Sequence, residues 1–167
     1  MTQGIVTFWQ SFGGVVIALM GVSIAVAMSC IGSAKGIGIA GEFAAGICAE
    51  KPTLFWKTMI LQILTGIQGI FGLAIWIVAV CRLGIIGGNL AEISAQTGWL
   101  IFFACLPVTI VGWRSAIYQG RVAAAAMRIL VKNPGAFREG IIYCGVVACF
   151  AVIAFKVTLL MLININI

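Results

Sequence analysis

The stretch YCGVVACFAVIAFKVTLLM, residues 143–161, decides the fold class, because it is a long apolar run that contains one lysine and no acid. A helix that crosses a bilayer needs about 20 predominantly apolar residues. The rest of the chain has a similar character: of its 167 residues, 63% are hydrophobic and 8% are charged. A soluble domain cannot hide so much apolar surface from water. The sequence therefore predicts a helical membrane protein.

Four segments are long and apolar enough to span the membrane. We expect an all-α membrane protein with transmembrane helices at about residues 13–45, 58–80, 99–130 and 141–163. The first and third exceed the thickness of a bilayer, so they are expected to project beyond it as helices.

The distribution of lysine and arginine predicts the orientation, since these residues favour cytoplasmic loops. The loop between the first two spans carries Lys51 and Lys57, and four more cations surround the loop between the last two. The connection at residues 81–98 has only Arg82 beside Glu92. We therefore expect the 1–2 and 3–4 loops in the cytoplasm and both termini on the opposite side. The net charge of +6 then fits anionic lipid headgroups and does not call for nucleic acid.

The sequence repeats itself with an offset of 82 residues. KP at 51–52 aligns with NP at 133–134, and GIGIAGEFAAG at 36–46 aligns with YQGRVAAAAMR at 118–128. Two spans separate equivalent positions, so the halves have the same orientation, unlike inverted repeats with an odd number of spans. The prediction is two duplicated helical hairpins, residues 1–82 and 83–167.

Small residues crowd the first span and the run Ala123–Ala126 of the third. In lipid, small residues let helix backbones approach closely. This pattern suits the inner wall of a closed ring of hairpins, and a simple four-helix bundle is the alternative. The chain has no histidine and no aspartate, and its six cysteines form no CxxC pair. The sequence thus offers no sign of soluble enzymatic chemistry, and no cofactor is expected.

Three stretches carry a family resemblance: GSAKGIGIAGEFAAG at 32–46, LQILTGIQGIFGL at 61–73 and YQGRVAAAAMRILVKNPGAFREGII at 118–142. They resemble the proteolipids of V-type and A/V-type rotary ATPases, above all the subunit K (c-type) proteins of the bacterial sodium-type enzymes. The resemblance implies a membrane rotor ring of like subunits, with the first and third helices inside, coupled to ATP hydrolysis or synthesis. It implies a stator a/I-type subunit and central-stalk subunits as partners, and Na⁺ or H⁺ as the transported ion.

The resemblance also implies an ion site, of which this sequence has only a part. The family's carbonyl donor matches Leu64, and its two glutamines match Gln68 and Gln119. Three further positions depart from the family pattern, with Ile67 in place of a threonine, Phe71 in place of a tyrosine and Ala148 in place of the helix-four glutamate. The repeat supplies no substitute acid, because the position equivalent to Ala148 is Gly66.

The residual set is poor in oxygen and carries no charge, whereas a cation in a dry site needs several oxygens and a compensating negative charge. The four acids of the chain, Glu42, Glu50, Glu92 and Glu139, are not expected at mid-membrane on an outward helix. Gln68 and Gln119 could contact Na⁺ directly. The favoured interpretation is that the two amides hydrogen-bond each other and join the hairpins.

Two cations, Arg114 and Lys156, fall within predicted spans, where charges are costly and often functional. Lys156 is expected to extend to the far interface along its aliphatic stem. Arg114 could hold a lipid phosphate, pair with an acid of another chain or repel cations from a disused site.

Three functional hypotheses follow. The chain is a transporting rotor subunit whose acid comes from elsewhere, a structural ring subunit beside a glutamate-bearing paralogue, or a stand-alone helical pore. A pore should have polar rings along one helix, whereas the expected inner face of the first helix is Gly, Ala and Ile.

Overall fold

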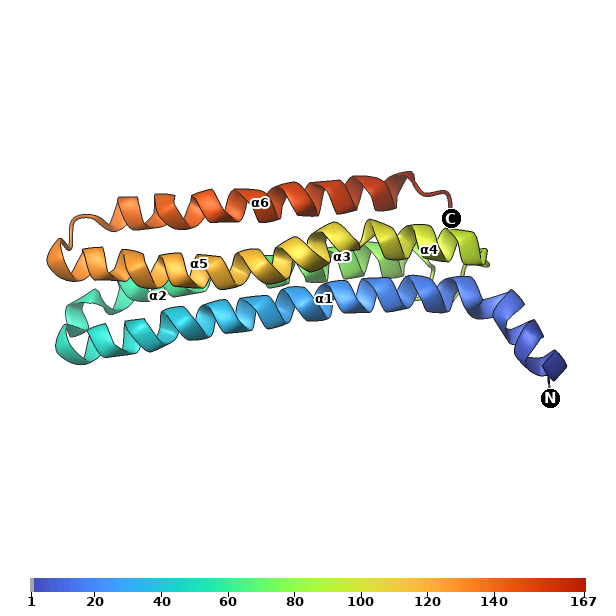
Figure 1. Ribbon diagram of the computed structural model, residues 1–167, viewed down its shortest axis with the longest axis horizontal. Helices are drawn as coiled ribbons and strands as arrows, with labels where there is room; N and C mark the ends of the chain where they lie inside the picture. Colours follow the sequence, from blue (N-terminus) through green and yellow to red (C-terminus); the bar gives the residue numbers. More distant parts are fainter. Residues whose placement is uncertain (1) are drawn as a thin grey trace.

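The computed structural model describes residues 2–167, which form a bundle of long helices along a common axis (Figure 1). The elements are α1 (Thr2–Glu50), η1 (Pro52–Leu54), α2 (Phe55–Leu64), α3 (Ile67–Arg82), α4 (Ala95–Ala104), α5 (Leu106–Lys132) and α6 (Phe137–Asn164). No strand occurs among the described residues. Helices are the expected solution, because a segment surrounded by lipid must satisfy its own backbone hydrogen bonds.

The four predicted spans are confirmed as helices long and apolar enough to cross a membrane. They cover Phe12–Glu50, Pro52–Arg82, Ala95–Lys132 and Phe137–Asn164. The 1–2 and 3–4 connections lie at one end of the bundle, and both termini lie at the other end with the 2–3 connection (Figure 1). This places the cation-rich loops on one side, while the assignment of that side to the cytoplasm remains a prediction.

Glycines bring α1 and α5 together along a parallel seam (Figure 1). A Cβ added to Gly120 would lie 2.4 Å from the carbonyl oxygen of Gly36, and one added to Gly36 would lie 2.4 Å from that of Ala116. One turn away, Gly32 faces the backbone of Trp113 at a similar distance. The two backbones are in direct contact, which is the close approach that small residues permit in lipid.

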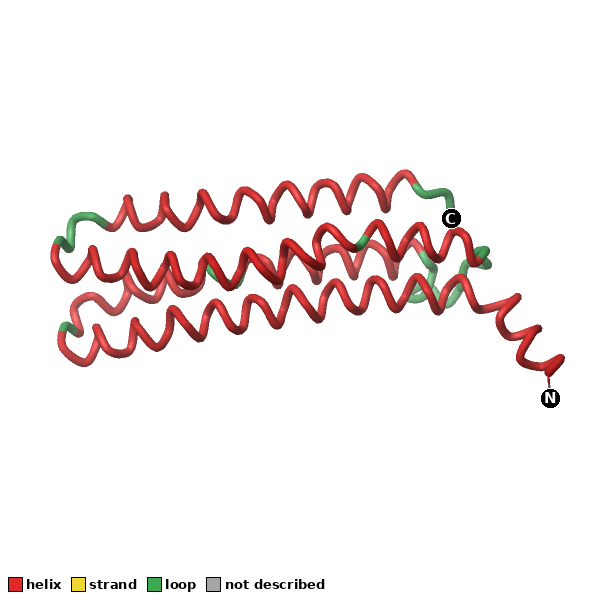
Figure 2. The backbone as a smooth tube through the Cα atoms, viewed as in Figure 1, coloured by secondary structure: helices red, strands yellow, loops and turns green. Residues whose placement is uncertain are grey.

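Two of the four spans are interrupted, the second near its middle and the third closer to its start, which the sequence analysis did not predict (Figure 2). Between α2 and α3 the N–H groups of Thr65 and Gly66 donate three residues back, to Gln62 and Ile63, at 3.1 and 2.9 Å. This tighter turn ends one helix and starts the next.

The other interruption, between α4 and α5, precedes Pro107, whose ring cannot continue a regular helix. Here the N–H of Val108 donates to the Thr158 hydroxyl of α6 at 3.2 Å. The Ser29 hydroxyl of α1 donates to the Val108 carbonyl at 3.4 Å. Side chains of two neighbouring helices therefore satisfy the backbone at the proline.

One helix end is capped by a glycine, and the last carbonyl groups of two other helices accept hydrogen bonds from cations. After α3, Gly84 adopts φ +70°, and Ile85 N–H donates to the Val80 carbonyl at 3.2 Å, as in a Schellman cap. The Lys51 ammonium donates to the Val131 carbonyl near the end of α5 at 2.9 Å. The Arg82 guanidinium donates to the Ile163 carbonyl near the end of α6 at 2.7 Å. These cations complement the negative ends of the helices, in addition to any part they play in membrane orientation.

The glycine seam yields a stability test with a matched control two residues away. Gly36→Ala is expected to lower the free energy of unfolding by about 1–3 kcal/mol, because its methyl group would overlap the α5 backbone. Gly38 has nothing within 4 Å of an added Cβ, so Gly38→Ala should be neutral or stabilising by less than about 1 kcal/mol. The measurement is denaturation of the monomeric chain in detergent. Equal effects of the two changes would contradict a close-packed seam at Gly36.

Candidate ion site

A layer of polar side chains crosses the middle of the bundle between two apolar clusters. One cluster, near the termini, includes Val22, Ile75 and Ile101, and the other, near the 1–2 loop, includes Leu61 and Met127. The buried polar residues of the layer are Ser29, Ser33, Thr65, Gln68, Ser115 and Gln119. We call them the polar layer.

The structure brings together the three matched positions of the predicted ion site. Gln68 Nε2 donates to Gln119 Oε1, and Gln119 Nε2 donates to the Leu64 carbonyl at 3.2 Å. Both glutamine side chains are almost wholly buried. The amides thus link the second span to α5, as the favoured interpretation of the sequence expected. Gln68 Oε1 is left buried without a hydrogen-bond partner in the described protein.

The interruption at Thr65 and Gly66 shapes this site. Thr65 turns toward α1, where an added Cβ on Gly36 would lie 3.5 Å from it, and its hydroxyl donates to the Gln62 carbonyl at 2.7 Å. Thr65 therefore adds no oxygen to the amide pair.

Ser33 is a member of the polar layer that sequence reasoning missed. Its hydroxyl accepts from Gly69 N–H at 2.7 Å and donates to the Gly66 carbonyl at 3.4 Å, so α1 is tied to the interrupted span. Its repeat equivalent, Ser115, is buried without a partner in the described protein. The reason is that α6 is continuous through Ala148, the equivalent of Gly66, and uses its own backbone groups. A search for serines 82 residues apart would have found the pair.

The three degenerate positions are apolar in the structure as well. Phe71 stacks on Phe155 of α6, with ring centroids 5.0 Å apart and planes at 26°. Ile67 and Ala148 are half-buried. The repeat equivalent, Gly66, serves as a backbone partner of Ser33 and carries no side chain. None of these positions provides an oxygen from its side chain.

The charged residues of the chain do not take the place of the carboxylate that the family pattern has at position 148. All four glutamates are exposed, at the end of α1, in the 2–3 connection and in the first turn of α6. Arg114 and Lys156 are exposed on α5 and α6. Among residues whose side chains are described, no group of three His, Cys, Asp or Glu could hold a metal ion.

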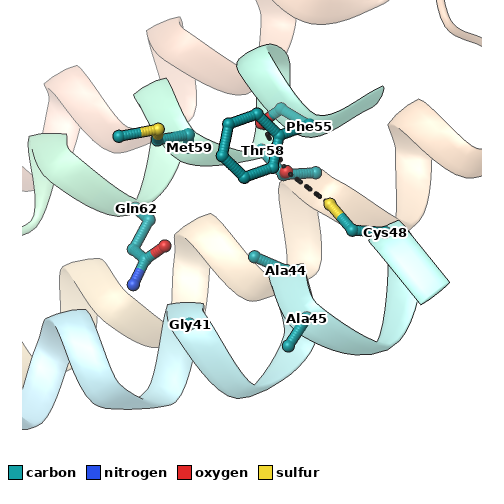
Figure 3. A pocket seen from close by; sticks show the side chains of 8 residues that line it. All are labelled: Gly41, Ala44, Ala45, Cys48, Phe55, Thr58, Met59 and Gln62. Carbon is teal, nitrogen blue, oxygen red and sulfur yellow. Dashed lines mark hydrogen bonds between the residues drawn. The ribbon is translucent and has the colours of Figure 1, made fainter. Parts of the chain in front are cut away.

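A separate cavity of about 280 Å³ lies near the 1–2 loop. Small residues of α1 form one wall, and Phe55, Thr58, Met59 and Gln62 form the other (Figure 3). The Cys48 thiol lies 3.5 Å from the Thr58 hydroxyl. None of the predicted ion-site residues lines this cavity, and its walls are mainly apolar, so it is not an ion site.

The architecture of two duplicated hairpins with a polar layer at mid-span is that of a known protein family. The family of the ATP synthase C subunits matches the chain twice, at residues 20–79 and 102–161. The chain belongs to this family. The two matches are offset by 82 residues, the spacing of the internal repeat.

Individual relatives agree with this assignment. V-type sodium ATPase subunit K of Enterococcus hirae is 37% identical over 152 residues, which cover 91% of this chain and 94% of that protein. A-type ATP synthase subunit K of Methanocaldococcus jannaschii is 26% identical over 150 residues, 90% of this chain and 63% of that protein. A V-type proton ATPase proteolipid of Candida glabrata, the c′ subunit, is 33% identical over 128 residues, 66% of this chain and 74% of that protein.

These matches confirm the resemblance to V-type ATPase proteolipids and the fold of four membrane-spanning helices in two duplicated hairpins. The chain is an integral membrane protein of this proteolipid family. The boundary between the hairpins at residues 82 and 83 and the role of each site residue remain predictions.

The amide pair can be tested with a double-mutant cycle. Gln119→Leu should lower the free energy of unfolding by about 1–3 kcal/mol, because it leaves Gln68 and the Leu64 carbonyl buried and unpaired. Combining it with Gln68→Leu should cost less than the sum, with a coupling of about 0.5–1.5 kcal/mol. Gln62, which donates to the Ile37 carbonyl at 3.4 Å, provides the control. A coupling between Gln62 and Gln119 as large as that between the amides would argue against a specific pair.

Proposed function

We propose that the chain is a rotor-ring proteolipid of a V-type ATPase that couples ATP hydrolysis or synthesis to Na⁺ or H⁺ transport. In this role it is a non-catalytic membrane subunit within a ring of like subunits. The family match, the four spans and the glycine seam between α1 and α5 support the proposal. The names of the relatives include both a sodium ATPase and a proton ATPase, so they do not select the ion.

The same proposal includes an orientation and a set of partners. The 1–2 and 3–4 loops would face the cytoplasm and meet the central-stalk subunits, while α6 would face the stator a/I-type subunit and the surrounding lipid. The placement of Lys51 and Lys57 at one end of the bundle supports this orientation. The low burial of α6, of whose most apolar window 22% is buried, supports its outward position.

A second, narrower proposal is that this chain does not itself carry the ion. The observation behind it is the pairing of Gln68 with Gln119, with the methyl group of Ala148 where the family pattern has a carboxylate. Of the three matched groups, the Leu64 carbonyl and Gln119 Oε1 already accept hydrogen bonds. Gln68 Oε1 remains as one neutral oxygen, which is too little for a dehydrated cation.

A ring made only of this chain would therefore lack a mid-membrane acid. The acid would have to come from a glutamate-bearing paralogue in the same ring, beside which this chain acts as a structural subunit. The number of ions moved per ATP would then depend on the ratio of the two subunits.

The first experiment is the intact mass of the subunits released from a purified ring that still transports ions. We expect a species of 17.6 kDa together with a second proteolipid that has a glutamate in its last span. Recovery of only the 17.6 kDa species from a transporting ring would refute the non-carrying role. Absence of this chain from any ATPase ring would refute the rotor-ring role.

Restoring the acid tests the role of Ala148. The Ala148→Glu chain, combined with Ile67→Thr and Phe71→Tyr, should bind radioactive sodium at least about tenfold more tightly than the parent chain, because a carboxylate supplies charge and two oxygens. The control replaces Ala148→Glu by Val152→Glu, which puts the same carboxylate one turn further along α6. Equal sodium binding by the parent chain would contradict an incomplete site.

A further inference from the structure

A basic hollow of about 230 Å³ lies on the exposed side of the seam between α1 and α5. Its lining consists of Lys35, Trp113, Arg114, Ile117, Tyr118 and Arg121. Three of these six side chains are cations, and none is an acid. The hollow is separate from the amide pair, because Gln119 points into the bundle while Arg114, Tyr118 and Arg121 are exposed on α5.

The positive charge of the basic hollow is only partly balanced by acids of the described protein. The adjoining hollow toward the loops contains Glu42 together with Lys35 and Arg121. Arg114 does not line that second hollow, so the one nearby acid is remote from the deepest cation. Cations at membrane depth are unfavourable unless an anion or a polar cavity accommodates them. A compensating anion is therefore expected from outside the chain.

Arg114 lies near the middle of the bundle along its axis. It precedes Gln119 by five residues, which is roughly 7–8 Å along a helix. Gln119 is bonded to Gln68, and Gln68 lies close to the centre of the span Pro52–Arg82. At this depth, Arg114 cannot be an ordinary loop cation of the kind that sets orientation.

The arrangement of the basic hollow suits a phosphate group. Arg114, Tyr118 and Arg121 share one face of α5, and the Arg114 guanidinium lies 5.6 Å from the Trp113 ring centroid and 6.0 Å from that of Tyr118. These contacts hold the guanidinium while its N–H groups stay available for paired hydrogen bonds to two oxygens. Trp113 Nε1 also has no hydrogen-bond partner in the described protein.

An apolar stripe continues from the basic hollow toward the terminal end of the bundle. It consists of Ile24 and Ile31 on α1 and Ile110 on α5, with exposed fractions of 42%, 46% and 57%. Ile31 lies one helical turn before Lys35 and Ile24 three turns before it, while Ile110 lies one turn before Arg114. The three isoleucines therefore share the helix faces that carry the cations. A cationic hollow beside an apolar stripe matches an amphiphile better than a free ion.

We propose that the basic hollow binds the phosphate headgroup of an anionic phospholipid whose acyl chains lie on the stripe of Ile24, Ile31 and Ile110. The site occurs once in the chain, although the hairpin is duplicated. The repeat equivalents of Lys35, Arg114 and Arg121 are Ile117, Gly32 and Ile39, so none of the three cations is repeated. The proposal concerns lipid binding and does not depend on ion transport.

Trp113 provides a local readout in the purified full chain. We would titrate the protein in neutral detergent with phosphatidylglycerol brominated on its acyl chains, and take the signal lost in Trp113→Phe as that of Trp113. Saturable quenching is expected. Arg114→Gln should weaken it about tenfold or more, because the paired charge-assisted hydrogen bonds are lost.

Arg128→Gln is the matched control, since Arg128 lies on the same helix but stacks 4.7 Å over Phe43 outside the hollow. It should change the affinity less than about twofold. Arg121→Gln serves as a second test if Arg114→Gln loses helical content. Equal quenching by brominated phosphatidylcholine, or equal weakening by Arg128→Gln, would overturn the proposal. Displacement by millimolar inorganic phosphate would assign the site to free phosphate and overturn the lipid assignment. Failure here would leave the proposed rotor role untouched, because no ring is required.

Discussion

The contact of the α1 and α5 backbones at Gly36 and Gly120 is the constraint on which the rest of the structure depends. Lipid provides little hydrophobic drive for helices to associate, so close backbone contact is the main source of cohesion. This contact fixes the rotation of α5 about its axis. Gln119 consequently faces the interior of the bundle, and the basic face with Arg114 turns outward. A bulkier residue at either glycine would disturb both the polar layer and the basic hollow.

The interruption of the second span supplies backbone groups that bond to the polar side chains beside this seam. A regular helix at mid-membrane uses its own N–H and C=O groups, whereas the turn at Thr65 and Gly66 presents backbone groups to α1 and α5. Ser33 bonds to Gly66 and Gly69, and Gln119 bonds to Leu64. Buried amides in lipid must be paired, and here they pair with each other and with the turn. The residues that match the predicted ion site thus connect the two hairpins through hydrogen bonds.

The two halves of the chain differ in where their helices are interrupted and in the side chains at several equivalent positions. The first half has its interruption in the second span, between α2 and α3, whereas the second half has its interruption between α4 and α5 and a continuous α6. Ser33 is bonded to the interrupted span, whereas Ser115 has no partner in the described protein. The positions at which the halves differ, such as Gly66 against Ala148 and Gly32 against Arg114, are those at which the site is incomplete and at which the basic hollow appears.

The sequence by itself determined the membrane class, the four spans, the duplication and the family, because apolar length, an 82-residue period and ordered motifs are properties of the chain as written. By resemblance, it also matched Leu64, Gln68 and Gln119 to the family's ion site and predicted that Ala148 stands in place of the family's glutamate. Only the tertiary structure decided between pairing of the amides, which the sequence favoured, and separate positions for them. It alone decided that Ser33 joins the layer and that Lys35 lies with Arg114 and Arg121 in one hollow. Those features depend on helix rotation and on the interruptions at Gly66 and Pro107, and both are set by packing between segments far apart in the sequence.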